Sequence, residues 1–169
     1  ALHAGLTQAM QSQLDGLMLD FYLIVSDYRA AYGKSWLASA NRLIPPNVFP
    51  FALNGLSAKY AVLSQDDFAR LCSDKADNVS VWARFAQPSR LAWVADEAAR
   101  RNVVASVAEA GSTLLALALP GVSPAERAGA RGVFEAGFAM TYTCELRAER
   151  KGRSGSIVES APDYYAALF

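Results

Sequence analysis

Apolar residues recur every three or four positions along the first thirty residues, as they do on one side of an α-helix. They fall at Leu6, Met10, Leu14, Leu17, Phe21, Ile24 and Tyr28. A second apolar set, Leu19, Tyr22, Leu23 and Val25, makes the later part apolar on more than one side. This spacing predicts a long core helix or a helix pair, and a helix that meets another subunit is the alternative.

Three prolines then interrupt the helical pattern between residues 41 and 53. Pro45, Pro46 and Pro50 lack a backbone donor and fix φ, which excludes a helix interior. We therefore expect an extended connector that lies against the helices or forms a short ribbon. A turn at residues 54–55 and a short strand at 59–63 should follow. Ser64, with Asp67 three residues later, marks the start of a short helix.

Further helix signals occupy the second half of the chain. Ser89 can cap a helix from Arg90 to about Arg101, whereas periodicity leaves residues 103–119 open between helix and extended chain. Ser123-Pro124-Ala125-Glu126 is a strong helix start, and this helix is expected to reach about Arg150. One side of its first half is thin, so another backbone or a ligand should approach it there; the small residues are Ala125, Ala128, Gly129, Gly132, Ala136 and Gly137.

Composition excludes several kinds of chemistry. The 169 residues suffice for one domain with a substantial core, and 16 basic residues balance 16 acidic ones. The single histidine, His3, argues against a His-based triad or metal site, and Cys72 and Cys144 fit no zinc or CxxC spacing. We expect two buried thiols, no metal and no cofactor. The longest apolar run, residues 17–25, is too short to span a bilayer, so we expect a soluble protein.

Two local motifs are set aside. The adjacent acid pairs, Asp66-Asp67 and Asp96-Glu97, do not face one another on a helix, so capping and solvation explain them better than acid–base catalysis. Residues 33–35, Gly-Lys-Ser, are similar to the end of a phosphate-binding P-loop. The glycine five residues earlier is missing, since Tyr28 stands there, and we expect no strand before it.

Arginines are the remaining candidates for function. Antiparallel helices would bring several of them to one end of the molecule and create a phosphate site, because guanidinium groups offer fixed donors and keep their charge. The alternative is an ordinary helix surface on which they pair with Glu97, Glu126 and Glu135. The six arginines are Arg84, Arg90, Arg100, Arg101, Arg127 and Arg131.

The order of these segments resembles the coat proteins of rod-shaped plant RNA viruses, the tobacco mosaic virus group. The resemblance is carried by Phe49-Pro50 in the extended stretch, by residues 62–71 at the start of a third helix, by Cys-Glu-Leu-Arg at 144–147, and by a tail running from Arg153 to Glu159. Val48 and Val158 depart from the family pattern, and residues 72–100 are longer than its simplest members need.

The resemblance implies an all-α fold, an antiparallel four-helix bundle with extended connectors. Residues 1–150 would form the bundle and residues 151–169 an extended tail, which an Arg153–Glu159 ion pair would tie to the bundle. Phe49 and Pro50 would belong to a hydrophobic belt at the outer radius of the rod.

The resemblance also implies where RNA would bind. Arg100 and Arg101 would hold its phosphates, with Arg84 and Arg90 as rivals, and bases would lie on the face of Gly129, Val133 and Gly137. Many copies of the chain would then assemble into a helical rod around single-stranded RNA, in the virion and, during assembly, in the host cytoplasm. We expect no enzyme and no membrane partner. The alternative is a bacterial helical adaptor or accessory subunit that forms a small closed oligomer without nucleic acid.

Overall fold

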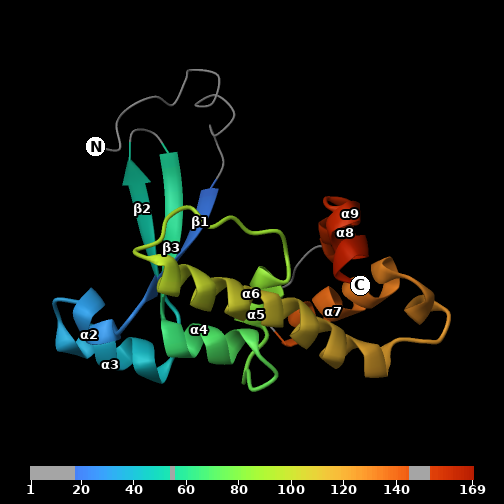
Figure 1. The fold of residues 1–169 in the computed structure, drawn as a ribbon, viewed down its shortest axis with the longest axis horizontal. Helices are drawn as coiled ribbons and strands as arrows, with labels where there is room; N and C mark the ends of the chain where they lie inside the picture. Colours follow the sequence, from blue (N-terminus) through green and yellow to red (C-terminus); the bar gives the residue numbers. More distant parts are fainter. Residues whose placement is uncertain (1–17, 54–55, 145–152) are drawn as a thin grey trace. The chain divides into compact units, whose positions relative to one another are not determined.

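A mixed three-stranded sheet organises the first part of the chain (Figure 1). The computed structural model describes residues 18–53, 56–144 and 153–169. It divides the chain into two units, Ala1–Gln65 and Asp66–Phe169. The expected division at residue 150 stays a prediction. The expected all-α four-helix bundle is wrong, because the first unit is built on strands.

The three strands are β1 (Met18–Val25), β2 (Asn47–Leu53) and β3 (Leu56–Ser64), in the order β1-β3-β2. β1 runs parallel to the central β3, whereas β2 runs antiparallel to it. Phe21, Tyr60 and Phe49 share one register row, and Phe49 stacks on Tyr60 with ring centroids 5.3 Å apart. The expected ribbon in the proline-rich stretch and the expected strand near 59–63 are both confirmed.

The helix expected to run through residues 18–25 is wrong, and the part of it before residue 18 lies outside the described residues. Met18–Val25 is a strand. Its aromatic and branched side chains favour extended chain, and a continuous apolar run cannot distinguish a strand from a helix by periodicity alone. Pairing with β3 along all eight residues decides between them.

Two short helices, α2 (Tyr28–Ala31) and α3 (Ser35–Leu43), pack against the sheet. Tyr28 of α2 and Ala38 of α3 pack with Val62 of β3 in a buried hydrophobic cluster. Partly buried Val25, Tyr32, Phe49 and Tyr60 surround this small core. The Asp27 side chain starts α2 by accepting a hydrogen bond from Arg29 N at 2.8 Å.

A buried asparagine fastens α3 to the sheet. Asn41 is fully buried, and its Nδ2 donates to the carbonyl oxygen of Val62 at 3.0 Å. Its Oδ1 accepts from Tyr32 Oη at 2.5 Å and from Asn47 N at 3.3 Å. One amide therefore joins α3, β3, the start of β2 and the residue that follows α2, and burial is tolerable because both ends of the amide have partners.

The second unit is helical. Its main elements are α4 (Gln65–Cys72, which starts at the unit boundary), α5 (Ser80–Phe85), α6 (Glu97–Ala118), α7 (Ala130–Cys144), α8 (Arg153–Glu159) and α9 (Pro162–Leu168), with 3-10 turns η1 (Leu119–Gly121) and η2 (Glu126–Ala128). α5 and α7 pack on α6, and α8 and α9 pack on α7. Thr113 Oγ1 donates to the Cys72 carbonyl at 2.9 Å and links α6 to α4.

The bounds of α6 differ from the expected helix at Arg90 and show the conformation of the segment after residue 102. The helix expected from Arg90 is wrong: α6 begins at Glu97, where Asp96 Oδ1 accepts from Ala99 N at 2.7 Å. A carboxylate at the N-cap is favoured by the helix dipole, so this start prevails over Ser89. Residues 103–118, left open by periodicity, are helical. The short helix expected after Ser64 is confirmed as α4.

The expected long helix from Ser123 is corrected to two pieces. The capping bonds form, since Ser123 N donates to Glu126 Oε2 at 3.0 Å, and Ser123 lowers the pKa of the Glu126 carboxyl through these hydrogen bonds. Only the 3-10 turn η2 follows, because Gly129 adopts an extended conformation (φ −155°, ψ 153°). α7 then starts at Ala130, and the expected end near Arg150 lies outside the described residues.

The tail forms two helices, so the expectation of an extended tail is wrong. Tyr165 of α9 is buried, with ring centroids 4.8 Å from Phe134 and 5.8 Å from Phe138 of α7. The aromatic residues near the end of the chain therefore extend the core of the second unit, and burial of this apolar area favours the helical form.

α6 together with η1, residues Glu97–Gly121, is long and apolar enough to cross a membrane by length and composition. Core helices of soluble proteins satisfy the same criterion. Ala110, Leu114 and Ala118 of this helix are buried inside the second unit. The expectation of a soluble protein stays a prediction.

We expect Asn41→Ala to lower the free energy of unfolding by about 2 to 3 kcal/mol, because it leaves buried hydrogen-bonding groups without partners. Urea titration followed by circular dichroism measures this change. Asn102→Ala, which alters an exposed asparagine in α6, is the matched control and should change stability by less than about 0.5 kcal/mol. Equal effects of the two substitutions would contradict the anchoring role of Asn41.

Candidate functional site

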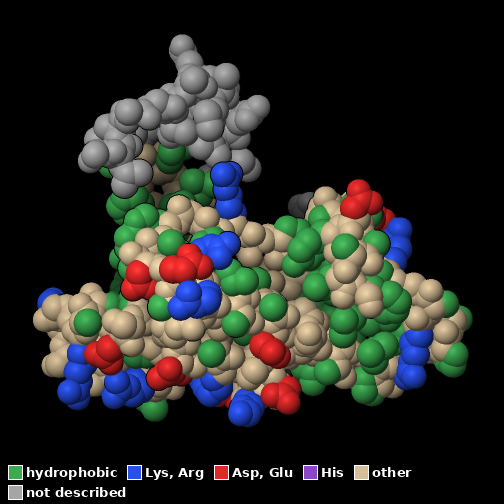
Figure 2. Space-filling view, viewed as in Figure 1, with side chains coloured by type: hydrophobic (Ala, Val, Ile, Leu, Met, Phe, Trp, Pro, Cys, Tyr) green, Lys and Arg blue, Asp and Glu red, His purple; other side chains and the backbone are tan. Residues whose placement is uncertain are grey.

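The structure separates the six predicted RNA-binding arginines into two groups. Arg84 lies in the last turn of α5, Arg90 lies in the segment between α5 and α6, and Arg100 and Arg101 occupy the first turns of α6. Arg100 Nη1 lies 3.4 Å from Glu97 Oε1, and both side chains are more than half exposed. Over the start of α6, basic and acidic side chains lie next to one another (Figure 2).

Arg127 and Arg131 are held by partners within the second unit. Arg127 Nε donates to the Val122 carbonyl oxygen at 2.9 Å. Arg131 contacts Glu159 at 2.6 Å and Glu135 at 2.7 Å, and these carboxylates, Glu159 first, raise the pKa of its guanidinium. The pairing with glutamates left open by the sequence is therefore found for Arg100 and Arg131, whereas RNA binding stays a prediction.

The thin side of the helix predicted from Ser123 faces α6 over part of its length. Val133 is fully buried, and a Cβ at Gly137 would overlap the side chain of Leu114. A Cβ at Gly132 would lie 2.7 Å from the carbonyl oxygen of Glu126. Gly129 alone of the three predicted base-contacting residues has open space around it. Small residues here allow close approach of another part of the chain, which leaves Val133 and Gly137 no room for a base.

The residues predicted for assembly lie in both units. Phe49 is half-buried on the covered face of the sheet, and Pro50 is exposed in the edge strand β2, where a missing donor is tolerated. Glu159 ties the tail to α7 through Arg131. The expected Arg153–Glu159 pair stays a prediction. Arg153 is the first residue of α8, and it is not without a partner.

The buried thiol of Cys72 and the buried phenol of Tyr165, both in the second unit, have raised pKa values. Burial raises the pKa of Cys72 to about 12, so its thiol stays protonated at neutral pH and is a poor nucleophile. Burial, with the nearby Tyr164, raises the pKa of Tyr165 to about 12 as well. Among the described residues no three His, Cys, Asp or Glu side chains gather as a metal site would require. Cys144 has no described side chain.

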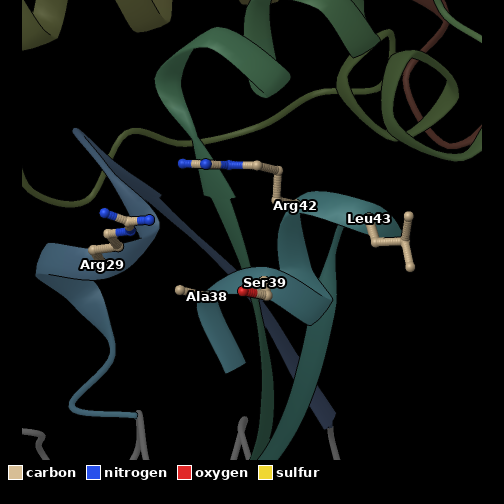
Figure 3. Close-up of a pocket in the computed structure, with 5 residues that line it drawn as sticks. All are labelled: Arg29, Ala38, Ser39, Arg42 and Leu43. Carbon is tan, nitrogen blue, oxygen red and sulfur yellow. The ribbon is translucent and has the colours of Figure 1, made fainter. Parts of the chain in front are cut away.

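A pocket in the first unit brings two arginines together. It has a volume of about 260 Å³ and is lined by Arg29 of α2 and by Ala38, Ser39, Arg42 and Leu43 of α3. Figure 3 shows the side chains of Arg29 and Arg42 reaching toward the same side of the helix pair. The Leu43 side chain turns away from them. Two guanidinium groups from two helices, with the hydroxyl of Ser39, supply hydrogen-bond donors of the kind that anions bind.

The charges around this pocket are only partly neutralised. Arg42 Nη2 lies 3.4 Å from Asp27 Oδ1, with the two side chains 63% and 46% exposed, which is a weak surface pair. The Arg29 side chain makes no hydrogen bond or ion pair within the part of the chain that the structure describes. Residues 27–43 contain three basic residues against Asp27 alone, and basic side chains gather over α2 and α3 in Figure 2.

Sequence reasoning missed this site. The signal was present as a local excess of Arg29, Lys34 and Arg42 over Asp27, whereas the predicted phosphate site used arginines between residues 84 and 131. Residues 33–35 lead into α3, which begins at Ser35, and α2 separates them from the strand β1. The strand–loop–helix arrangement of a P-loop is therefore absent here. Asn41 places Arg42, the next residue, at the pocket by fixing α3 on the sheet.

Comparison with known protein families finds no matching family, and comparison with characterised proteins finds no match either. The resemblance to the coat proteins of rod-shaped viruses therefore stays a prediction.

Gly137→Ala should lower the free energy of unfolding by about 1 to 2 kcal/mol, because the added methyl group overlaps the buried Leu114 side chain and outweighs the better helix propensity of alanine. Thermal unfolding measures this effect. Gly129→Ala is the matched control, since open space surrounds Gly129. A Gly137→Ala protein as stable as the parent would mean that this face is free, as base contact requires.

Proposed function

We propose that this chain is a ligand-binding protein whose α2–α3 pocket holds a small anionic molecule. One observation carries the proposal: Arg29 and Arg42 come from two different helices and line the same pocket. Guanidinium groups keep their charge at all physiological pH values and donate several hydrogen bonds in a fixed fork, which suits phosphate and carboxylate groups.

The pocket suits a small ligand or the charged end of a larger one. Its volume of about 260 Å³ lies below the range of roughly 300–1,000 Å³ that drug-sized ligands occupy. Ala38 is buried and Leu43 exposed, so the pocket adds little apolar contact beyond the two arginines and Ser39. Charge-assisted hydrogen bonds would therefore supply most of the binding free energy.

The positions of the two arginines are fixed by the rest of the unit. α2 is held by its Asp27 cap and by burial of Tyr28, and α3 is held by Asn41. Binding then requires little ordering of the backbone, and a preorganised site loses less entropy when it binds its ligand.

We expect Arg29→Ala and Arg42→Ala each to weaken binding of inorganic phosphate about tenfold or more, since each removes a charge-assisted hydrogen bond of about 1.5 to 3 kcal/mol. Isothermal titration calorimetry of the full chain measures the affinity. Lys75→Ala removes an exposed positive charge in the second unit and is the matched control. Absence of saturable binding, or equal loss in the control, would refute the anion site.

A second candidate is self-assembly around single-stranded RNA. Its supporting observation is the exposure of large apolar side chains in and near the proline-rich segment, where a coat subunit would meet its neighbours: Leu43 (81%), Ile44 (74%), Val48 (55%) and Phe51 (51%). Contiguous exposed apolar side chains are typical of interaction surfaces. The fold does not strengthen this candidate, because the four-helix bundle of the resembled family is absent from the first unit.

Electron microscopy of the purified protein, with absorbance at 260 and 280 nm on the same sample, tests this second candidate. Rods or stacked discs with excess absorbance at 260 nm would support assembly on RNA. Small particles free of nucleic acid at every pH and salt concentration tried would exclude it and would favour the alternative of a small closed oligomer.

A further inference from the structure

We infer that the α2–α3 pocket selects a phosphate monoester in its dianionic form over singly charged anions, and that Asp27 is the residue responsible for this selection. The inference rests on the proposed anion site and specifies its ligand class. It starts from the two guanidinium groups that line the pocket, Arg29 and Arg42, and from the one carboxylate, Asp27, that contacts the second of them.

Asp27 already supplies one negative charge beside the pocket. Its Oδ2 accepts the backbone N–H of Arg29, and its Oδ1 lies 3.4 Å from Arg42 Nη2. A singly charged ligand that binds Arg42 competes with the Asp27 carboxylate. It replaces one negative charge beside Arg42 by another, so little electrostatic free energy is gained. A dianion carries one negative charge for each of the two lining guanidinium groups and can replace Asp27 at Arg42, with Asp27 still capping α2 through Arg29 N.

The capping role makes Asp27 difficult to displace. Its hydrogen bond to Arg29 N starts α2, and loss of an N-cap costs about 1 kcal/mol. A competing carboxylate is therefore a fixed part of the site. Anions that carry a single charge always meet this competitor.

The pH dependence of ligand affinity reports whether the pocket prefers the dianion. Phosphate monoesters lose their second proton with a pKa of about 6, whereas aspartate ordinarily ionises below pH 5 and lysine and tyrosine above pH 9. The titratable groups on the two helices and their connection are Asp27, Tyr28, Tyr32 and Lys34, and those on β1 and β3 are Asp20, Tyr22, Lys59 and Tyr60. Burial raises the pKa of Tyr32. The second ionisation of the phosphate monoester falls between pH 5 and 7.5.

Calorimetric titration of the full chain with glycerol 3-phosphate tests the inference, with dimethyl phosphate as the singly charged comparator. We expect affinity for the monoester to rise about tenfold from pH 5.0 to 7.5, because the dianion fraction rises by that factor. Affinity for dimethyl phosphate should stay low and constant. Equal affinity for the two ligands, or a flat profile for the monoester, would overturn the selection.

Asp27→Asn is the sharpest variant, because asparagine caps helices as well as aspartate does and the substitution removes only the charge. We expect it to strengthen dimethyl phosphate binding about threefold or more and to narrow the preference for the monoester. Asp74→Asn, in an exposed turn of the second unit, is the matched control and should change neither ligand's affinity. An unchanged preference in Asp27→Asn would overturn the role of Asp27.

The outcomes separate this inference from the proposed function. Binding of both ligands that is lost in Arg42→Ala, with no pH dependence, would leave the anion site standing and refute the dianion selection. Absence of any binding that depends on Arg29 or Arg42 would refute both. Vesicles of phosphatidylcholine, with and without phosphatidic acid, identify the source of the monoester. Arg42-dependent binding to the vesicles that contain phosphatidic acid would show that the monoester is a lipid headgroup. Binding of glycerol 3-phosphate without binding to these vesicles would show that it is a free metabolite.

Discussion

The buried amide of Asn41 is the interaction on which the first unit depends. It bonds at once to the central strand, to the start of β2 and to Tyr32 beyond α2. A polar group with no exposure is stable only when its partners are in place. Sheet pairing and helix placement are therefore coupled. The same hydrogen bonds fix the positions of the pocket residues on α2 and α3.

Local signals in the sequence predicted the fold where chemistry within a few residues decides the conformation. The prolines at 45, 46 and 50 give an extended chain, Ser64 and Asp67 mark α4, and the capping bonds at Ser123 form as expected. Long-range pairing was not predictable. Met18–Val25 is apolar enough for a helix or a strand, and β3, some forty residues further along, decides between them. The same applies to the tail, whose aromatic residues fold back on α7.

The candidate site was less predictable than the fold. Counting arginines identified residues with the right chemistry, but a count does not reveal which of them already have carboxylate partners, as Arg100 and Arg131 do. The small residues of α7 likewise signalled close approach without saying what approaches, and for Gly137 it is Leu114 of α6. Arg29 and Arg42 are thirteen positions apart, and only the turn between α2 and α3 brings them to one pocket.

Residue-resolved NMR on the full chain during titration with inorganic phosphate tests the central claim most directly, because it identifies which part of the protein meets the anion. The account predicts that amide shifts concentrate in residues 27–43, with Arg29, Ser39 and Arg42 among the largest. Shifts that concentrate instead at the start of α6, around Arg100 and Arg101, or that spread evenly over the basic residues, would contradict it.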